Sequence, residues 1–455
     1  MSESATLTMP QMPPCDHRPR PYDGPPAEEV LALRRQAVNP AVFTYYKQPL
    51  MITDGHMQYL FDETGRRYLD FIAGIATVSC GHCHPKVTAR VIEQVSRLQH
   101  ATTLYLHPTL PRLAEKLLSK LPPELDTVYF LNSGSEANDL AITMARLFTG
   151  NRDVIAVRNA YHGGVATALG LTSHHTWKYP IPHGDGIHHA ICPDPYRSPF
   201  DGSPDEIAER SADDVADLVR FTTCGNVAAY IAEPIQGVGG TTYGAPGYLE
   251  RAYATVREHG GLCISDEVQT GFGRTGNHYW GFENFGVVPD MVTMAKGIGG
   301  GFPLAAVATR REIAEPLAQR IHFNTFAGNP VSMAAGLAVM ETIEEDGLQE
   351  NARIVGGQLK AGLERLAERQ RLIGVVRGLG LMLGVELVRD RATKEPATSE
   401  TAEVLEAARN LGVLLGKGGL YGNVLRIKPP LCITSDDVEF GLDVLDRVFS
   451  EVAGR

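Results

Sequence analysis

Short apolar runs alternate with stretches of helical periodicity from about residue 71 to residue 330. The strand candidates are Val128–Leu131, Val154–Val157, Ala228–Ile231, Leu262–Ile264, Met291–Ala295 and Leu304–Ala308. Helical patterns lie between them, most clearly at Ser135–Thr149 and Gly247–His259. Because parallel strands are joined by helical crossovers, this alternation indicates βαβ units. It predicts an α/β fold whose large domain is built on a mostly parallel sheet.

Different patterns flank this region. Before it, Gln58–Phe61 and Arg67–Phe71 are separated by the turn Asp62–Gly65 and predict a hairpin. After it, the predicted helices are Val331–Glu345, Leu348–Gln370, Thr401–Leu411 and Ser435–Val452, with strands at Gly380–Leu387 and Val424–Ile427. We therefore expect three parts. They are an N-terminal arm and hairpin over residues 1–70 that joins the small domain, a large domain over 71–330, and a smaller α+β domain over 331–455.

The charge balance narrows the choice of partners. The 42 basic and 53 acidic side chains give a net charge of −11, which argues against a nucleic acid or an anionic membrane as the main partner. No apolar run approaches the length that crosses a bilayer. An anionic ligand must therefore be bound locally, by helix ends and single basic residues. We expect small molecules as the partners.

The cysteines and the N-terminal segment bear on the compartment. Seven cysteines, an odd number, are scattered along the chain, as is typical of a reducing compartment. Residues 1–26 are proline-rich and contain acidic residues, and they lack the features of a secretory signal or a transit peptide. These observations predict a cytoplasmic enzyme. The near-contiguous Cys80, His82, Cys83 and His84 fit poorly with the separated ligands of structural zinc sites, so we predict no metal site.

Lys296 ends the apolar run that starts at Asp290 and is followed at once by a glycine-rich turn. A plain core strand would avoid a lysine, since an unpaired buried charge is costly. A lysine held at the end of a buried strand loses its charge readily and can form a Schiff base. Taken alone, the position is more typical of a lysine whose end reaches solvent.

A second polar group follows another buried strand, where Ile264 and Ser265 run directly into Asp266 and Glu267. For a single aspartate, a structural ion pair is the better interpretation. Asp266 and Lys296, however, end successive strand candidates and should therefore meet at one edge of the sheet. An acid that keeps a pyridine ring protonated beside a Schiff-base lysine is the basic equipment of pyridoxal phosphate chemistry.

Gly134 and Ser135 stand where a strand turns into a helix. Free N–H groups and the helix dipole make such a start an anion site, although an ordinary N-cap is the alternative. The lysine and the aspartate favour a phosphate site, because they call for a phosphorylated cofactor. Tyr161 or His162 could stack on its flat ring or could be a core residue.

Two further positions have candidate roles. The Thr325 hydroxyl, in the segment from His322 to Pro330, could bind phosphate. Arg426 is a candidate holder of a substrate carboxylate, with an exposed arginine on an edge strand as the open alternative.

From about Pro40 to the C-terminus, the chain resembles the class III pyridoxal-phosphate aminotransferases. The motifs that carry the resemblance are Asn132–Ala137, Ala232–Gly237, Asp266–Gly276, Ala295–Gly297 and Asn324–Pro330, in the order of that family. The resemblance implies fold type I, pyridoxal 5′-phosphate as cofactor, and a homodimer with active sites at the subunit interface. Pairing of dimers into tetramers stays open.

The resemblance also implies a role for each matching residue. Those that meet the cofactor are Lys296 as its covalent anchor, Asp266 on the ring nitrogen, Val268 and Tyr161 on the two ring faces, Gln269 on the phenolic oxygen, Gly134 and Ser135 on the phosphate, and Thr325 on the phosphate of the partner subunit. Those that meet the substrate are Glu233 and Arg426, of which the arginine binds an α-carboxylate and the glutamate neutralises the arginine when no carboxylate is near.

One departure bears on the substrate. Gly164 stands where the ornithine and acetylornithine branches of the class carry an arginine. The resemblance therefore implies small donors, such as alanine, β-alanine or 3-aminoisobutyrate, and glyoxylate or pyruvate as acceptor, in a ping-pong reaction. The alternatives are another ω-amino acid aminotransferase, a phospho-lyase or an aminomutase of the same fold. A binding protein without turnover is disfavoured by the intact lysine, aspartate and phosphate turn.

Overall fold

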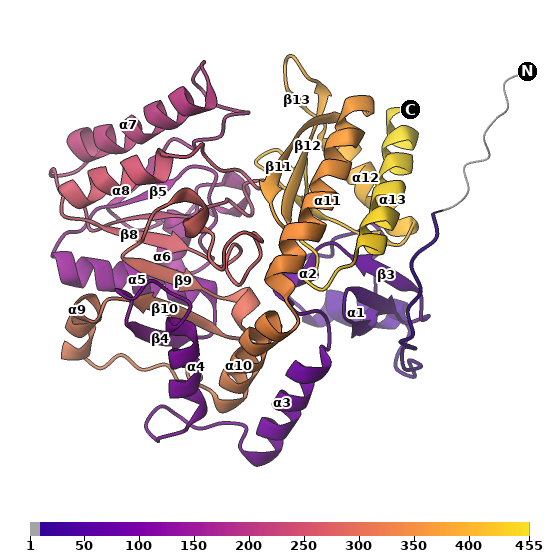
Figure 1. Ribbon diagram of the computed structural model, residues 1–455, viewed down its shortest axis with the longest axis horizontal. Helices are drawn as coiled ribbons and strands as arrows, with labels where there is room; N and C mark the ends of the chain where they lie inside the picture. The colour runs from indigo at the N-terminus through magenta and orange to yellow at the C-terminus, as the bar shows by residue number, and fades with distance from the viewer. Residues whose placement is uncertain (1–9, 455) are drawn as a thin grey trace, which may run out of the picture.

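The computed structural model describes residues 10–454, and the statements below refer to that part of the chain. A large sheet with its helices forms one side of the molecule, and a smaller sheet with the C-terminal helices and the N-terminal hairpin forms the other (Figure 1). The α/β architecture predicted from the alternating patterns is confirmed.

The large sheet has seven strands within residues 10–454, in the order β4-β10-β9-β8-β7-β5-β6. Their bounds are β4 (Thr127–Leu131), β5 (Val154–Val157), β6 (Ile187–Ala190), β7 (Ala229–Ala232), β8 (Leu262–Asp266), β9 (Met291–Met294) and β10 (Ala305–Thr309). Strands β9, β8, β7, β5 and β6 pair in parallel, so the prediction of a mostly parallel sheet is confirmed.

The direction of β10 differs from the predicted βαβ pattern. This strand runs antiparallel to both β9 and β4. Its connection from β9 holds only the 3₁₀ turn η3 (Lys296–Ile298), and a parallel return needs a crossover of a dozen residues or more. The parallel direction predicted from the alternation of elements is therefore wrong for β10. Its position along the chain was predicted to within one residue.

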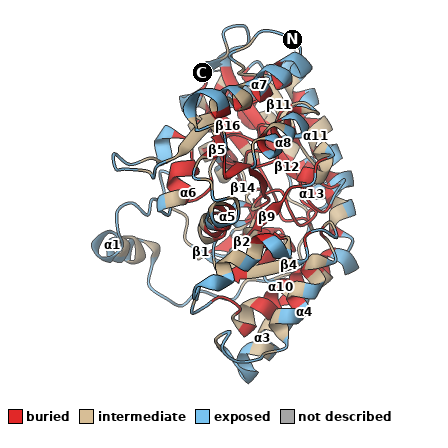
Figure 2. Cartoon of the chain, turned by 90° about the vertical axis from the view of Figure 1, so that its left-hand side faces the viewer, coloured by how far each residue is buried: buried red, intermediate tan, exposed pale blue. Residues whose placement is uncertain are grey.

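Helices cover both faces of the large sheet. Along β5, Val154 and Ala156 pack in the same apolar cluster as α5 (Gly134–Thr149). Ile155 and Val157 point the other way, into the cluster that includes residues of α7 (Pro204–Thr222) and α8 (Tyr248–Glu258). Since successive side chains of a strand face opposite sides, this alternation defines a three-layer arrangement. Buried residues are accordingly concentrated in the strands (Figure 2).

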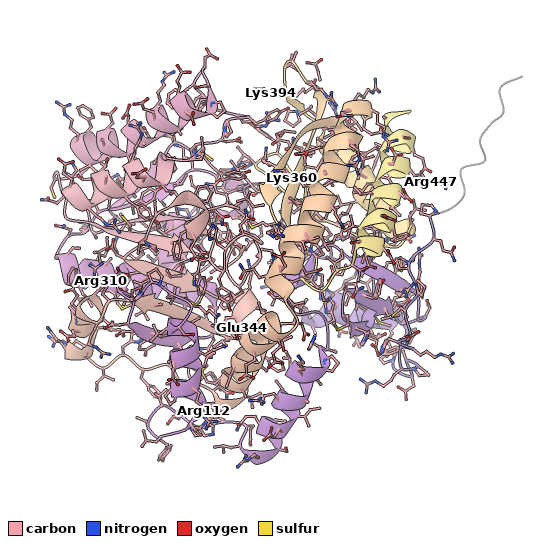
Figure 3. All side chains as sticks on the ribbon, viewed as in Figure 1. Arg112, Arg310, Glu344, Lys360, Lys394 and Arg447 are labelled. Atoms are coloured by element: carbon pink, nitrogen blue, oxygen red, sulfur yellow. The ribbon has the colours of Figure 1, made fainter. Side chains whose placement is uncertain are left out.

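Six further helices within residues 10–454 complete the large domain and its border. They are α2 (Ala73–Ala76), α3 (Pro85–Arg97), α4 (Thr109–Leu118), α6 (Ala166–Leu171), α9 (Arg311–Ala314) and α10 (Pro330–Glu345). Helix α10 packs against both α3 and α4. Glu344, labelled in Figure 3, accepts hydrogen bonds from Lys116 and from Lys120, which anchors α4 to the end of α10.

The N-terminal hairpin was predicted correctly. It consists of β2 (Tyr59–Asp62) and β3 (Arg67–Asp70), which pair antiparallel, and β1 (Ile52–His56) precedes it. Strand β3 also pairs in parallel with β14 (Val413–Leu414), so the hairpin shares a sheet with the C-terminal region. The domain boundaries at residues 70 and 330 stay a prediction.

The second sheet of the C-terminal region has the order β11-β12-β16-β15, with β13 paired to β12. Its strands are β11 (Ile373–Leu379), β12 (Met382–Asp390), β13 (Glu395–Pro396), β15 (Gly416–Gly418) and β16 (Val424–Ile427). Its helices are α11 (Leu348–Arg369), α12 (Thr398–Asn410) and α13 (Ser435–Ala453). The predicted helices and the strand at β16 are confirmed, whereas β11 and β15 were not predicted.

The described part of the N-terminal arm lies along the hairpin. His17 Nε2 is 2.9 Å from Asp54 Oδ1, and Arg67 Nη2 donates to Pro13 O. Helix α1 (Ala27–Ala37) follows and contains no buried residue, and it stands away from the rest of the chain in Figure 2. Within residues 10–454, every helix is too short or too polar to span a bilayer.

Asp437, at the start of α13, links the hairpin to the C-terminal region. The carboxylate is fully buried and accepts from Gln58 Nε2 at 2.7 Å and from Tyr59 Oη, while it also caps its own helix with Thr434. We predict that Asp437→Ala lowers the free energy of unfolding by about 3 kcal/mol, because buried donors lose their acceptor. Thermal and denaturant-induced unfolding measure this. The matched control is the exposed neighbour Asp436→Ala, and an equal loss in both variants would contradict the assignment.

Candidate active site

A cavity of about 170 Å³ lies at the carboxyl ends of β8 and β9. Its lining comes from five separate stretches of sequence and comprises Gly134, Ser135, Asn138, Tyr161, His162, Gly163, Glu233, Asp266, Val268, Gln269, Ala295 and Lys296. The parallel pairing of β8 with β9, with Asp266 opposite Thr293, carries Asp266 and Lys296 to the same edge of the sheet. Eight of the ten predicted site residues therefore meet in one cavity.

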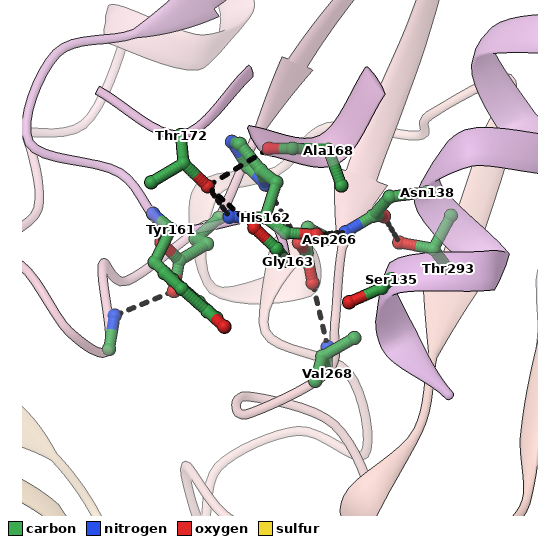
Figure 4. A network of polar contacts seen from close by, with 12 residues as sticks. Ser135, Asn138, Tyr161, His162, Gly163, Ala168, Thr172, Asp266, Val268 and Thr293 are labelled. Carbon is green, nitrogen blue, oxygen red and sulfur yellow. Dashed lines mark hydrogen bonds and ion pairs between the residues drawn. The ribbon is translucent and has the colours of Figure 1, made fainter. Parts of the chain in front are cut away.

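The Asp266 carboxylate is the best-connected polar group of this cavity. Its Oδ2 accepts a hydrogen bond from Asn138 Nδ2 at 2.8 Å and lies 2.8 Å from His162 Nδ1 (Figure 4). Its Oδ1 accepts a hydrogen bond from Val268 N at 3.1 Å. Only 3% of the residue is exposed. Because buried carboxylates are costly without donors, this network compensates the burial of Asp266 and holds its carboxylate in one orientation at the cavity wall.

Two members of the network, Asn138 and His162, were not predicted to contact Asp266. Asn138 lies one helical turn after Gly134 on α5, so the i,i+4 spacing placed it on the cavity side of the helix and was a usable signal. It also accepts from Thr293 Oγ1 at 2.6 Å. The sequence left open whether His162 stacks on a ring or lies in the core. The structure buries His162 against Asp266, with Nε2 free of any recorded hydrogen-bond partner.

Lys296 begins η3 with a backbone φ of 47°, an uncommon conformation for a residue with a side chain. Such strained conformations cluster at functional sites. Burial lowers the pKa of the Lys296 amine to about 8, with a smaller contribution in the same direction from Arg426. The carboxylates of Glu233 and Asp266 oppose this shift without cancelling it. A large fraction of this amine is therefore neutral, and nucleophilic, near physiological pH.

The start of α5 forms a concave turn beside Lys296. Ser133 caps the helix by accepting from Glu136 N, which leaves the N–H groups of Gly134 and Ser135 without intrahelical partners. A Cβ at Gly134 would lie 3.1 Å from Val268 Cγ2, and one at Gly163 would lie 2.4 Å from Ser135 Oγ. Glycine at both positions therefore keeps the turn narrow and open. The helix dipole and these free donors suit an anion.

Tyr161 forms another wall of the cavity. Its ring packs at 4.9 Å from the ring of Trp177, with 59° between the planes. Trp177 lies in the short 3₁₀ turn η1 (His175–Trp177), and no sequence pattern pointed to it. On the opposite side, Gln269 is 6% exposed, and its Oε1 accepts from Lys428 Nζ at 2.9 Å.

Glu233 and Arg426 do not form a recorded contact with each other within residues 10–454. Glu233 Oε1 accepts from Tyr161 N at 3.1 Å and Oε2 from Gly237 N at 2.7 Å. Burial raises the pKa of this glutamate, and the charge of Asp266 adds to the rise. The Nε and Nη1 atoms of Arg426 are buried without hydrogen-bond partners. The guanidinium thus offers unused donors, and the predicted gating pair stays a prediction.

Thr325 lies apart from the other predicted residues. It is exposed and does not line the cavity of its own chain. The cysteine and histidine cluster considered for zinc also lies elsewhere. His82 Nε2 is 2.7 Å from Asp70 Oδ2, whereas His84 Nε2 is 3.1 Å from Asp346 Oδ2, so the two imidazoles bind different acids.

Comparison with known proteins agrees with this geometry. Residues 43–449 match the family model described as aminotransferase class III. The chain is 54% identical over 97% of its length to alanine–glyoxylate aminotransferase 2 homolog 2, mitochondrial, of Arabidopsis thaliana, covering 91% of that protein. It is 43% identical to the human alanine–glyoxylate aminotransferase 2, mitochondrial, over 98% of this chain and 90% of that one. A solved Arthrobacter phospholyase in complex with phosphoethanolamine superposes with a TM-score of 0.87 at 34% identity, over 92% and 99% of the two chains.

These relatives correct one prediction. Both alanine–glyoxylate aminotransferases carry the word mitochondrial in their names, which contradicts the cytoplasmic localisation inferred from the sequence. That inference rested on the prolines and acidic residues of residues 1–26. Composition in such a segment is a weak guide to compartment, because targeting signals are read by receptors rather than set by bulk chemistry.

The lowered pKa of Lys296 predicts how the cofactor-free protein reacts with amine reagents. Since only the neutral amine reacts, labelling of Lys296 should rise with pH through a midpoint near 8, more than two units below an ordinary lysine. Peptide mass spectrometry after brief treatment with an acylating reagent measures this residue by residue. The exposed Lys47 serves as the internal reference. Parallel pH profiles for the two lysines would disprove the lowered pKa.

Proposed function

We propose, since the chain belongs to the class III aminotransferase family, that it is a pyridoxal-phosphate-dependent aminotransferase acting on small amino acids and small 2-oxo acids. The observation that carries the proposal is the meeting of Lys296, Asp266 and the start of α5 in one cavity. Each of these groups, taken alone, could have a purely structural role. Together they match the three demands of one cofactor, which are an amine for its aldehyde, an acid for its ring nitrogen and donors for its phosphate.

The shape and the lining of the cavity suit pyridoxal 5′-phosphate. The glycines at 134 and 163 leave a cradle that a Cβ would fill, and the free N–H groups of α5 suit a phosphate. Val268 and Tyr161 both line the cavity and supply apolar surface for a flat ring. When bound, this cofactor supplies an aldehyde that condenses with amines and a protonated ring that withdraws electrons from the substrate carbon.

The residues of the chain divide the remaining work. The Lys296 amine would hold the cofactor covalently, and its free Nζ would take the proton from the carbon that bears the amino group. Asp266, oriented by Asn138 and His162, holds the proton on the ring nitrogen. The donors around Asp266 hold its carboxylate in one orientation at the cavity wall, where it would face the ring nitrogen.

Arg426 and Gly164 support the proposed substrate class. The buried, unpaired donors of Arg426 suit a carboxylate, which amino acids and 2-oxo acids share. At Gly164 a Cβ would meet open space, so no side chain there holds the far end of a longer substrate. The names of the 54% and 43% identical relatives point to alanine as donor and glyoxylate as acceptor. β-Alanine, 3-aminoisobutyrate and pyruvate belong to the same chemical range.

We also propose that the active unit is a homodimer. The loop around Tyr105 and Leu106 exposes large apolar side chains, as do the neighbouring Ile321 and Phe326. A cavity of about 790 Å³ lies between these loops. Apolar surface of this extent is typical of an interface. Because Thr325 is exposed beside it, a second subunit offers the simplest route by which this hydroxyl reaches a phosphate in the partner's site.

A phospho-lyase is the alternative that a specific observation favours, since the solved relative binds phosphoethanolamine. The two reactions leave different products. An aminotransferase given only the donor stops after one turnover per site and releases no phosphate or ammonia, whereas a phospho-lyase continues and releases both.

The first prediction of this proposal concerns a single half-reaction. Pyridoxal-phosphate-loaded protein mixed with alanine alone should form about one pyruvate per subunit and then stop until glyoxylate is added. Coupled assays for pyruvate, phosphate and ammonia measure this. Phosphoethanolamine should yield neither phosphate nor ammonia, and Lys296→Ala should abolish pyruvate formation. Continuous phosphate release from phosphoethanolamine would replace the proposal with the lyase.

The second concerns the dimer. Leu106→Asp should weaken self-association at least about tenfold, because it places a charge in an apolar interface, and it should weaken cofactor binding in parallel. Sedimentation velocity and cofactor titration measure the two effects. Phe221→Asp, a change at an apolar side chain that is 70% exposed on α7, is the matched control. A Leu106→Asp protein that dimerises and binds cofactor normally would rule out this interface.

A further inference from the structure

Lys428 follows β16 directly and lies behind the cavity wall. It is 2% exposed and is not among the residues that line the cavity. Its Nζ donates to Gln269 Oε1 at 2.9 Å and to Gly237 O at 3.3 Å. Gln269 in turn lines the cavity. Among the residues described, the contact between Lys428 and the cavity therefore runs through Gln269, which stands in front of it.

The surroundings of Lys428 make it a costly side chain to bury. Arg426, Lys296 and Arg274 all disfavour its charge, and burial lowers its pKa furthest, with Glu233 as the opposing carboxylate. A methionine or leucine would fill the same space without this penalty. The compensation recorded in the structure is the pair of oxygen acceptors, one of which is the Gln269 amide.

Gly237 also confines the Gln269 amide. A Cβ on Gly237 would lie 2.2 Å from Gln269 Nε2 and 2.3 Å from Cδ. A side chain at position 237 would therefore have to displace the end of Gln269, and Gly237 does not have the positive φ that would demand glycine for backbone reasons. The amide thus lies against Gly237 and is hydrogen-bonded to Lys428, and each limits its rotation.

We propose that Lys428 is a positioning residue that fixes the Gln269 amide, with Oε1 toward Lys428 and Nε2 toward the cavity. Lys428 Nζ donates to Gln269 Oε1, so it meets the amide at its oxygen end. Gly237 O, also an acceptor, gives Lys428 a second reason to present donors. The cavity therefore receives an N–H donor at this point.

This inference rests on the proposed function, in which Gln269 meets the phenolic oxygen of pyridoxal phosphate. A donor fixed there stabilises negative charge on that oxygen, whereas a flipped amide would set an oxygen against it. Loss of the donor favours protonation of the nitrogen that links Lys296 to the cofactor, because the phenolic oxygen then attracts that proton more strongly. The pH midpoint of the bound cofactor's absorbance change reports this directly and without turnover.

The main test compares this midpoint in cofactor-loaded wild type and Lys428→Met. We expect an upward shift of about one pH unit in the variant. Lys360→Met is the matched control, because Lys360 is a half-buried lysine on α11 that also donates to a backbone carbonyl, Gly378 O at 3.1 Å, away from the cavity (Figure 3). Its midpoint should equal that of wild type. An unchanged midpoint in Lys428→Met overturns the proposal.

A double variant separates positioning from simple charge. If Lys428 acts through the amide, Lys428→Met should shift the midpoint much less in a Gln269→Leu background than in wild type. An equal shift in both backgrounds would mean that Lys428 acts only by its charge, and it would overturn the positioning role. Circular dichroism and melting temperature check that each protein is folded.

Gly237→Ala keeps the test decisive if Lys428→Met does not fold. This substitution displaces the Gln269 amide from the other side and leaves Lys428 in place. It should raise the midpoint in the same direction, and an unchanged midpoint overturns the proposal. The wild type tests the underlying function separately. A wild-type protein that does not bind pyridoxal phosphate through Lys296 overturns the proposed function together with this inference, whereas normal binding with unshifted variants overturns this inference alone.

Discussion

The parallel pairing of β8 with β9 is the constraint on which the site depends. It sets Asp266 opposite Thr293 and delivers Lys296 two residues beyond the end of β9 to the same edge of the sheet. Helix α5 packs on β8, β9 and β10, so its N-terminus opens onto that edge too. Ligands in open α/β sheets bind at the carboxyl ends of the strands for this reason. A change of strand order would separate the amine, the acid and the anion cradle.

Basic side chains gather near the cavity, although the chain as a whole has more acidic than basic residues. The protein carries −11 overall, yet Lys296, Lys428, Arg426 and Arg274 lie close enough to influence one another. Glu233 and Asp266 are the carboxylates that oppose them. Basic side chains with unused N–H donors in a poorly solvated cavity suit ligands that carry phosphate and carboxylate groups. The same crowding disfavours extra protons on Lys296 and keeps its amine reactive.

Most of the candidate site could be predicted from the sequence, because its residues lie in short, contiguous motifs. Lys296, Asp266 and the Gly134–Ser135 turn each follow a strand that hydrophobic pattern alone detects. Asn138 and His162 stood inside or beside quoted motifs, but their role needed the distance to Asp266, which no local pattern encodes. Trp177 and Lys428 were out of reach, because each meets its partner across a long stretch of chain.

The sequence by itself determined the class of fold, the positions of the large-sheet strands other than β6, the main helices of the C-terminal region, and the candidate residues for a phosphorylated aldehyde cofactor. These follow from periodicity and from residue chemistry at strand ends, both of which act over a few neighbouring residues. The tertiary structure alone decided that β10 runs antiparallel, that the hairpin pairs with β14, and that Glu233 bonds to backbone N–H groups. It also decided that a buried lysine stands behind Gln269. Such features arise from pairing and packing between distant segments, where burial sets the free energy of every polar group and forces each one to find its partner.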